Sequence, residues 1–129
     1  MTNVVVLGHG GYAEGIQKNL KMLMGDLKHF YFLDFYPNED LETFKQKLHE
    51  LIEKNGLKQV VFICDLTGGS PFREACMLSI GKPEMQVVSG VNTSAISEIS
   101  FMLDESPIEI AKTCVEVTKQ SVLHFLKDE

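Results

Sequence analysis

Short apolar runs and longer amphipathic stretches alternate along the chain. After their first residue, the segments 3–7 and 59–64 are apolar at consecutive positions, which is typical of strands buried on both faces of a parallel sheet. Residues 29–35 are rich in aromatic side chains, and residues 85–90 form a fourth short apolar run, so both are also predicted to be strands. The chain therefore contains four predicted strands.

Each predicted strand is followed by apolar residues at helical spacing. Ser70 is the predicted N-cap of the third helix, with Pro71 in its first turn. A capping box at 106–109 predicts the start of the last helix, whereas residues 121–126 fit either its final turn or a short strand. The first two predicted helices have apolar faces from Ala13 to Leu27, with Gly25 and Asp26 near the stop, and from Leu41 to Ile52, with Asn55-Gly56 as the C-terminal signal. The others are residues 71–80, a segment carrying Ile96, Ile99 and Leu103, and a segment in which Ile108 to Phe125 fit a helix face.

Four successive strand–helix units predict an α/β fold, with an open, mainly parallel four-stranded sheet and helices on both faces. The length of 129 residues and the hydrophobic content of 44% predict one domain over residues 1–129. Ligands of such sheets bind beyond the carboxyl ends of the strands. Three segments are expected at that edge, namely residues 8–11, 65–70 and 89–93.

Composition narrows the class of protein. No apolar stretch approaches the roughly 20 residues that cross a bilayer, so a soluble, cytoplasmic protein without direct membrane insertion is expected. A net charge of −6 without a basic cluster argues against nucleic acid as a partner. Cys64, Cys76 and Cys114 lie in apolar segments without C-x-x-C spacing, which predicts buried thiols rather than disulfides or metal ligands.

The glycine-rich stretch Gly8–Ala13 permits a first hypothesis, which is dinucleotide binding. It satisfies G-x-G-x-x-A after a strand, and Asp34 lies near the end of the next strand, where a ribose-binding carboxylate is expected. No Gly-Lys-Ser/Thr follows the first strand, so the P-loop pattern is absent.

A second hypothesis makes His9 the reactive group, because its flanking glycines leave the imidazole open to approach. A neutral imidazole is a good nucleophile when a carboxylate holds its other nitrogen. Asp65 would be that carboxylate if the first and third strands are neighbours. The segment Thr67, Gly68, Gly69 and Ser70 offers backbone N–H groups, a hydroxyl and a helix start, which together suit an anion.

A third hypothesis is a receiver-like signalling domain phosphorylated on Asp65, at the end of the third strand. Such domains bind magnesium through acidic residues after the first strand, where this chain has Gly8-His9. The acidic residues of "PNEDLE" are interpreted as ordinary charges of a helix start and a solvated helix face.

The residues of the second hypothesis resemble a known family. "VVVLGHGGYAEG", "ICDLTGGSPF" and "VVSGVNTS" are similar to the histidine motif, the D-x-x-G-G-S-P-F signature and the G-V-N segment of the enzyme IIA component of the mannose-type sugar phosphotransferase system. The resemblance covers essentially the whole chain. It implies that His9 is phosphorylated, that Asp65 hydrogen-bonds it, and that Thr67, Gly68, Gly69 and Ser70 bind the phosphoryl group.

The resemblance also implies partners. His9 would accept a phosphoryl group from the carrier HPr and pass it to an enzyme IIB subunit or domain for sugar uptake, with no cofactor and no metal. A similar domain that supplies phosphoryl groups to dihydroxyacetone kinase is an alternative. The family forms homodimers by exchanging a C-terminal antiparallel strand, which would be residues 121–126 here.

Two positions depart from the family pattern. Gly8 stands where many relatives have Ser or Thr before the histidine, so any hydroxyl contact from that position is absent. Arg73 stands where a neutral residue is commoner, and it could reach either a phosphate or a carboxylate of a partner protein. A position on the partner surface is the interpretation favoured from the sequence.

Overall fold

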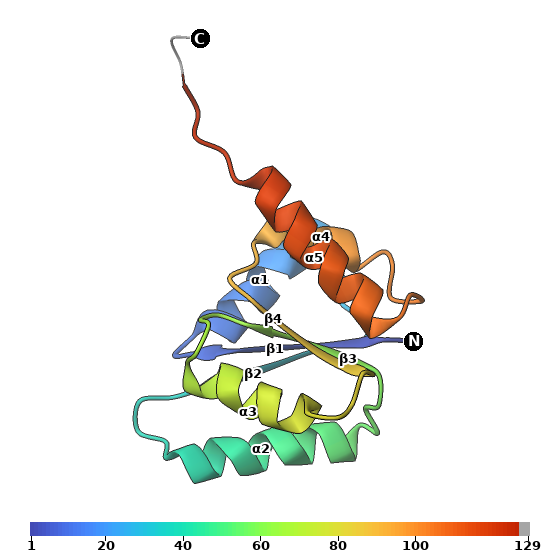
Figure 1. The fold of residues 1–129 in the computed structure, drawn as a ribbon. Coiled ribbons are helices and arrows are strands. Elements are labelled where there is room, and N and C mark those ends of the chain that lie inside the picture. The colour runs from blue at the N-terminus through green and yellow to red at the C-terminus, as the bar shows by residue number, and fades with distance from the viewer. Residues whose placement is uncertain (127–129) are drawn as a thin grey trace.

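Strands and helices alternate from the first strand to the fourth helix in the computed structural model, which describes residues 1–126 (Figure 1). Among these residues there are four strands and five helices, and the last two helices follow one another. Their bounds are β1 (Asn3–His9), α1 (Tyr12–Met24), β2 (Phe30–Phe35), α2 (Leu41–Lys54), β3 (Val60–Cys64), α3 (Ser70–Ser79), β4 (Met85–Ser89), α4 (Thr93–Ile99) and α5 (Pro107–Ser121). All four predicted strands are therefore confirmed.

The four strands form one parallel sheet in the order β2-β1-β3-β4. Strands β1 and β3 are neighbours in the centre, with Leu7 opposite Cys64. The chain leaves β1 toward β2 on one side and later returns to β3 on the other side. The carboxyl ends of β1 and β3 therefore meet where the strand order reverses, which is the usual ligand position in open α/β sheets.

Helices cover both faces of the sheet, as the sequence predicts. Helices α1, α4 and α5 lie on one face, and α2 and α3 lie on the other (Figure 1). Val4 and Val6 of β1 point into the first core, whereas Val5 and Leu7 point into the second. This arrangement explains why consecutive positions of the central strands are apolar.

Polar side chains begin three of the helices. Asp40 accepts a hydrogen bond from the Thr43 N–H at 2.8 Å, and Asn92 accepts one from the Ala95 N–H at 3.0 Å. Ser106 accepts one from the Glu109 N–H, which confirms the start predicted for α5. The fourth helix ends earlier than the spacing indicates, because α4 stops at Ile99 and Leu103 reaches the core from the following turn.

The last helix ends at Ser121, so the helical alternative for residues 121–126, one of the two that the sequence left open, does not hold beyond that residue. Residues 122–126 have neither helix nor strand structure and extend away from the body (Figure 1). Val122, Leu123 and Phe125 are exposed there. None of the helices within residues 1–126 has both the length and the apolar content to cross a membrane.

Candidate functional site

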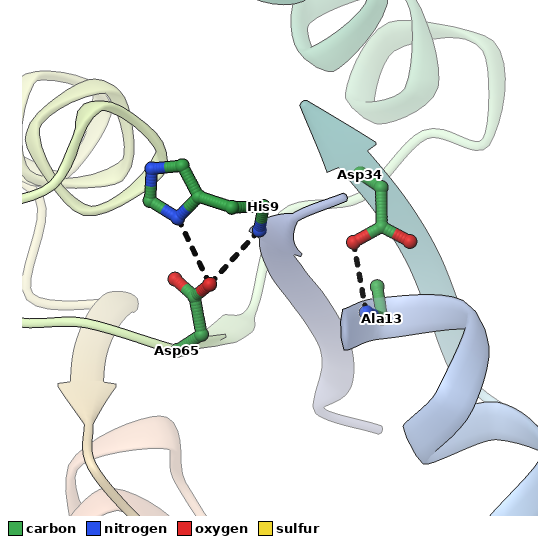
Figure 2. Close-up of polar contacts among 4 residues, drawn as sticks. All are labelled: His9, Ala13, Asp34 and Asp65. Carbon is green, nitrogen blue, oxygen red and sulfur yellow. Dashed lines mark hydrogen bonds and ion pairs between the residues drawn. The ribbon is translucent and has the colours of Figure 1, made fainter. Parts of the chain in front are cut away.

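His9 lies at the carboxyl end of β1 and is held by Asp65, which directly follows β3 (Figure 2). The His9 peptide N–H donates to Asp65 Oδ2 at 2.9 Å, and the imidazole Nδ1 lies 2.9 Å from the same oxygen. Because a carboxylate only accepts hydrogen bonds, Nδ1 carries the shared proton, and in the neutral imidazole the lone pair is then on Nε2. The structure thus brings together the histidine and the carboxylate singled out in the sequence.

The two side chains differ in exposure. The His9 side chain is 42% exposed, whereas that of Asp65 is 15% exposed. Asp65 Oδ1 is buried and has no hydrogen-bond partner among residues 1–126. In Figure 2 the second ring nitrogen of His9 points away from Asp65. The anchoring carboxylate is therefore largely buried, whereas the imidazole that it holds stays partly exposed.

The loop after β3 packs directly against the imidazole. A Cβ atom placed on Gly69 would lie 2.8 Å from His9 Cε1 and 3.4 Å from Nε2. A distance of 2.8 Å is too short for two carbon atoms, so a larger residue at position 69 would displace the ring. Gly68, one residue earlier, has a φ of +84°, a conformation that favours glycine. The two glycines thus bring the backbone up to the face of His9.

The same loop leads into α3, but its start differs from the sequence prediction. Gly69 is the N-cap and Ser70 is the first helical residue, so the expected capping role of Ser70 is wrong. The physical reason is the imidazole, which leaves no room for a side chain at position 69. As a glycine, this N-cap has no side chain with which to cap α3, so backbone N–H groups at the start of the helix stay available to an anion. Thr67 Oγ1 hydrogen-bonds Ser89 Oγ, which ties the loop to the end of β4.

Tyr12 explains the glycine that precedes His9. A Cβ atom on Gly8 would lie 2.5 Å from Tyr12 Cδ1 and 2.6 Å from Tyr12 Cβ. Burial raises the pKa of Tyr12, and the negative charge of Asp65 adds to the effect. The Tyr12 phenol therefore stays protonated at neutral pH. The Cβ and ring carbons of Tyr12 occupy the space that a serine or threonine side chain at position 8 would need.

Cys64 immediately precedes Asp65 but does not offer a competing nucleophile. Burial, together with Cys76 and Asp65, raises the pKa of the Cys64 thiol to about 12. A thiol with this pKa is almost entirely protonated at neutral pH, and only the thiolate is strongly nucleophilic. Cys64 and Cys114 are buried free thiols as predicted, and Cys76 is a half-buried one.

A small cavity beside His9 involves a carboxylate that the sequence interpretation missed. Its volume is about 210 Å³, and Glu39 lines it together with residues after β2. The Glu39 side chain is only 8% exposed and pairs with Lys47, so it is not the solvated charge expected from "PNEDLE". Pairing β2 next to β1 would have pointed to Glu39, because the carboxyl ends of both strands then lie at the same edge of the sheet. The lining residues are His9, Gly10, Phe35, Tyr36, Pro37 and Glu39.

Asp34 has a structural role that disfavours the dinucleotide hypothesis. Its buried carboxylate accepts hydrogen bonds from the N–H groups of Ala13 at 2.8 Å and Glu14 at 3.0 Å, at the start of α1 (Figure 2). A dinucleotide would need this helix start for its pyrophosphate and Asp34 for its ribose. The N–H groups of this helix start and the Asp34 carboxylate already hydrogen-bond each other, so a dinucleotide would have to break these bonds.

Asp34→Ala is expected to lower the free energy of unfolding by about 2 kcal/mol, because buried N–H groups at the start of α1 lose their acceptor. Urea denaturation followed by circular dichroism measures the change. Asp26→Ala, which removes an exposed aspartate after α1, is the control and should be nearly neutral. Equal stability of the two variants would contradict the anchoring role of Asp34.

Asp65 is already hydrogen-bonded to His9, which disfavours the receiver hypothesis. Its Oδ2 accepts both hydrogen bonds from His9. Gly8 and His9 supply no carboxylate at the carboxyl end of β1. Within residues 1–126, no three His, Cys, Asp or Glu side chains are grouped as metal ligands would be.

Sequence comparison identifies the family. The sequence model described as PTS system fructose IIA component, where PTS denotes the phosphotransferase system, matches residues 3–120. The chain belongs to this EIIA family. Family membership supports a phosphotransfer role in a sugar phosphotransferase system. The resemblance stated from the sequence motifs is thereby confirmed.

Individual relatives of this EIIA chain agree with the assignment. It is 33% identical over 126 residues to the PTS system mannose-specific EIIAB component of Escherichia coli K12, which covers 95% of the chain and 39% of the relative. It is 26% identical over 97 residues to the PTS system sorbose-specific EIIA component of Lacticaseibacillus casei, which covers 75% of the chain and 70% of the relative. The chain thus spans about two fifths of the E. coli relative.

Solved structures share the fold of the EIIA chain. The mannose/sorbose specific IIA subunit from Enterococcus faecalis superposes with a TM-score of 0.89, covering 99% of this chain and 97% of that one at 23% identity. The EIIA component from Streptococcus agalactiae gives a TM-score of 0.87, covering 97% and 98% at 21% identity. The parallel α/β architecture is therefore that of phosphotransferase-system EIIA structures.

Proposed function

We propose that the chain is a phosphocarrier that accepts a phosphoryl group from phospho-HPr on His9 Nε2 and passes it to an enzyme IIB subunit or domain for sugar uptake. The observation that carries this proposal is the 2.9 Å contact between His9 Nδ1 and Asp65 Oδ2, which in the neutral imidazole puts the lone pair on Nε2 of a 42% exposed side chain. Family membership supports the same role. The E. coli relative is itself named an EIIAB component, which favours an enzyme IIB acceptor.

The geometry suits an in-line transfer between two imidazoles. The lone pair of His9 Nε2 forms a bond to phosphorus while the bond from phosphorus to the donor imidazole breaks, and that electron pair returns to the donor ring. The proton on Nδ1 stays between His9 and Asp65 throughout. Positive charge develops on the His9 ring, and the Asp65 carboxylate stabilises it. Transfer to the acceptor is the same step in reverse.

The loop after β3 provides the place for the phosphoryl oxygens. Gly69 lies against Nε2, and the uncapped start of α3 follows directly. Backbone N–H groups at a helix start attract anions through hydrogen bonds and through the helix dipole. Thr67, Gly68, Gly69 and Ser70 would therefore surround the phosphoryl group, with the Ser70 hydroxyl as an additional donor.

The test is transfer of labelled phosphate from phosphoenolpyruvate through enzyme I and HPr. We expect one label per chain, on the peptide that contains His9. The label should be lost in acid and retained in alkali, as a phosphohistidine is. A label that alkali destroys and that maps to Asp65 would instead indicate an acyl phosphate and contradict the proposal. Release of the label to candidate IIB proteins then identifies the acceptor.

Gly69→Ala is expected to reduce the rate of phosphoryl acceptance about 100-fold, because its Cβ would push the imidazole away from its present position. The rate of label uptake at saturating phospho-HPr measures this effect. Gly15→Ala in α1 is the matched control, because a Cβ there meets no atom within 4 Å. Equal rates for both variants would show that ring position does not depend on the loop.

A homodimer is the second part of the proposal. A groove formed by β4 and α5, lined by Val87, Val88, Ala111, Lys112, Val115 and Glu116, lies along the edge of the sheet. The exposed apolar segment 122–126 of a second copy would cover it by adding a strand to β4, which protects both apolar surfaces.

The double variant Leu123→Glu/Phe125→Glu is expected to be monomeric, because two charges would have to enter the apolar contact. Light scattering after size exclusion measures the mass of the wild-type chain and of the variant. Met22→Glu, at an exposed position of α1, is the control and should remain dimeric. A monomeric wild-type chain would contradict the dimer.

A further inference from the structure

Arg73 is the only arginine of the chain, and it lies in the first turn of α3, beside the candidate site. Its side chain is exposed and forms no ion pair within residues 1–126. We propose that the Arg73 guanidinium binds the phosphoryl group carried by His9 and stabilises the phosphorylated chain. The inference rests on the proposed function, and nothing in the comparisons assigns a role to this residue.

The position of Arg73 relative to His9 follows from the helix. The Arg73 N–H donates to the Gly69 carbonyl oxygen at 2.9 Å, so the two residues are one helical turn apart on the same side. A Cβ on Gly69 would lie 3.4 Å from His9 Nε2. Since Cβ atoms one turn apart are about 6 Å from each other, the Arg73 Cβ lies within roughly 10 Å of Nε2.

The direction of the side chain also favours contact. Long side chains of a helix lean toward its N-terminus, which here means toward Gly69 and the imidazole. In Figure 2 the His9 ring lies on the side of β1 toward the yellow-green ribbon that contains α3. An extended arginine spans most of the distance to Nε2, and a phosphoryl group on Nε2 projects outward from the ring. The two groups can therefore meet without movement of the backbone.

Electrostatics gives the reason for a cation at this place. A phosphoryl group carries a charge of about −1.5 to −2 at neutral pH, and on His9 it would lie near the Asp65 carboxylate, whose Oδ1 has no hydrogen-bond partner in residues 1–126. Lys47 is paired with Glu39 and is already neutralised. The start of α3 also offers fewer amide donors than usual, because Pro71 has no N–H. A guanidinium, which binds phosphate oxygens in pairs, supplies both the charge and the missing donors.

The competing interpretation, favoured from the sequence alone, places Arg73 on the surface that contacts a partner protein's carboxylate. The two interpretations predict different measurements. A residue that binds the phosphoryl group changes the isolated phosphorylated chain, even when no partner is present. A residue that binds only the partner changes the concentration of phospho-HPr needed for transfer.

The experiment compares Arg73→Met and Arg73→Lys with the wild-type chain, and uses Lys82→Met, beyond the far end of α3, as a control that removes one exposed positive charge. Each chain is phosphorylated through HPr and then separated from it. Phosphorus NMR against pH follows the second ionisation of the phosphoryl group. A nearby cation favours the dianion and so lowers the pKa of this ionisation. Arg73→Met should therefore raise that pKa, with an acid dissociation constant about tenfold smaller than that of the wild-type chain.

The equilibrium of phosphoryl transfer with HPr gives a second measurement. Arg73→Met should shift this equilibrium toward phospho-HPr by about tenfold or more, as expected for loss of a charge-assisted hydrogen bond. Arg73→Lys should recover part of the shift, since it keeps the charge but loses the paired donors. Lys82→Met should behave as the wild-type chain does.

The outcomes separate the hypotheses. A wild-type chain that takes no label on His9 would overturn both the proposed function and this inference. A labelled wild-type chain with an Arg73→Met variant that has the same phosphoryl ionisation and transfer equilibrium would overturn the inference alone. If that variant also needed more phospho-HPr for transfer, Arg73 would belong to the partner surface.

Discussion

His9→Gln is expected to abolish phosphoryl acceptance, with a loss of about 10³-fold or more in the rate of label uptake. The lone pair of an amide nitrogen is delocalised into the carbonyl group, so it does not attack phosphorus. The fold should be preserved, since the His9 side chain is 42% exposed and lies at the end of a strand. Incorporation of labelled phosphate from phospho-HPr measures the loss.

His49→Gln is the matched control for this variant. It makes the same chemical change at an exposed position of α2, away from the edge of the sheet that holds His9. It should take up label at the wild-type rate. Uptake by His9→Gln at the wild-type rate would mean that another residue is phosphorylated, and the proposed carrier role of His9 would have to be abandoned.

Asp65→Asn should have the second largest effect, a reduction of about 10²- to 10³-fold in the rate at saturating phospho-HPr. The asparagine keeps the size of the side chain but has no negative charge to stabilise the ring as it becomes positive. It also no longer fixes the proton on Nδ1, because an amide can either donate or accept. The loss should therefore lie mainly in the rate of transfer rather than in the binding of HPr.

Single-turnover measurements over a range of phospho-HPr concentrations separate these two contributions. Asp104→Asn, at an exposed position after α4, is the control for the change of charge. A variant at Asp65 that needs more phospho-HPr but reaches the wild-type maximal rate would show that Asp65 acts in docking rather than in orienting His9.

Most of the architecture follows from the pattern of residues along the chain. Consecutive apolar residues such as Val4 and Val5 can only be buried together if both faces of the strand are covered, and the two cores show this. The pairing of His9 with Asp65 depended on one further condition, the adjacency of β1 and β3. Local sequence does not determine strand order, so this contact was a hypothesis until the fold was known.

The details that the sequence did not predict depend on contacts between distant segments. Ser70 has the properties of an N-cap, but the imidazole of His9 forces a glycine into that position. Glu39 lies in an acidic stretch typical of a solvated helix start, yet Lys47 and the residues beside His9 bury it. Residues 122–126 form neither a helix nor a strand within this chain, although the sequence pattern fits both, because a short apolar pattern alone does not decide between them.

The close packing of Tyr12 on Gly8 makes these two positions epistatic. Serine or threonine before the histidine would collide with the tyrosine ring and also with its Cβ, which would lie only 2.6 Å away. Because every residue except glycine carries a Cβ, that exchange also requires the start of α1 to shift or position 12 to become glycine. An evolutionary path between this histidine loop and the hydroxyl-containing version must therefore change positions 8 and 12, or the backbone between them, together. Any chimera that grafts the loop from a relative should carry both positions as a unit.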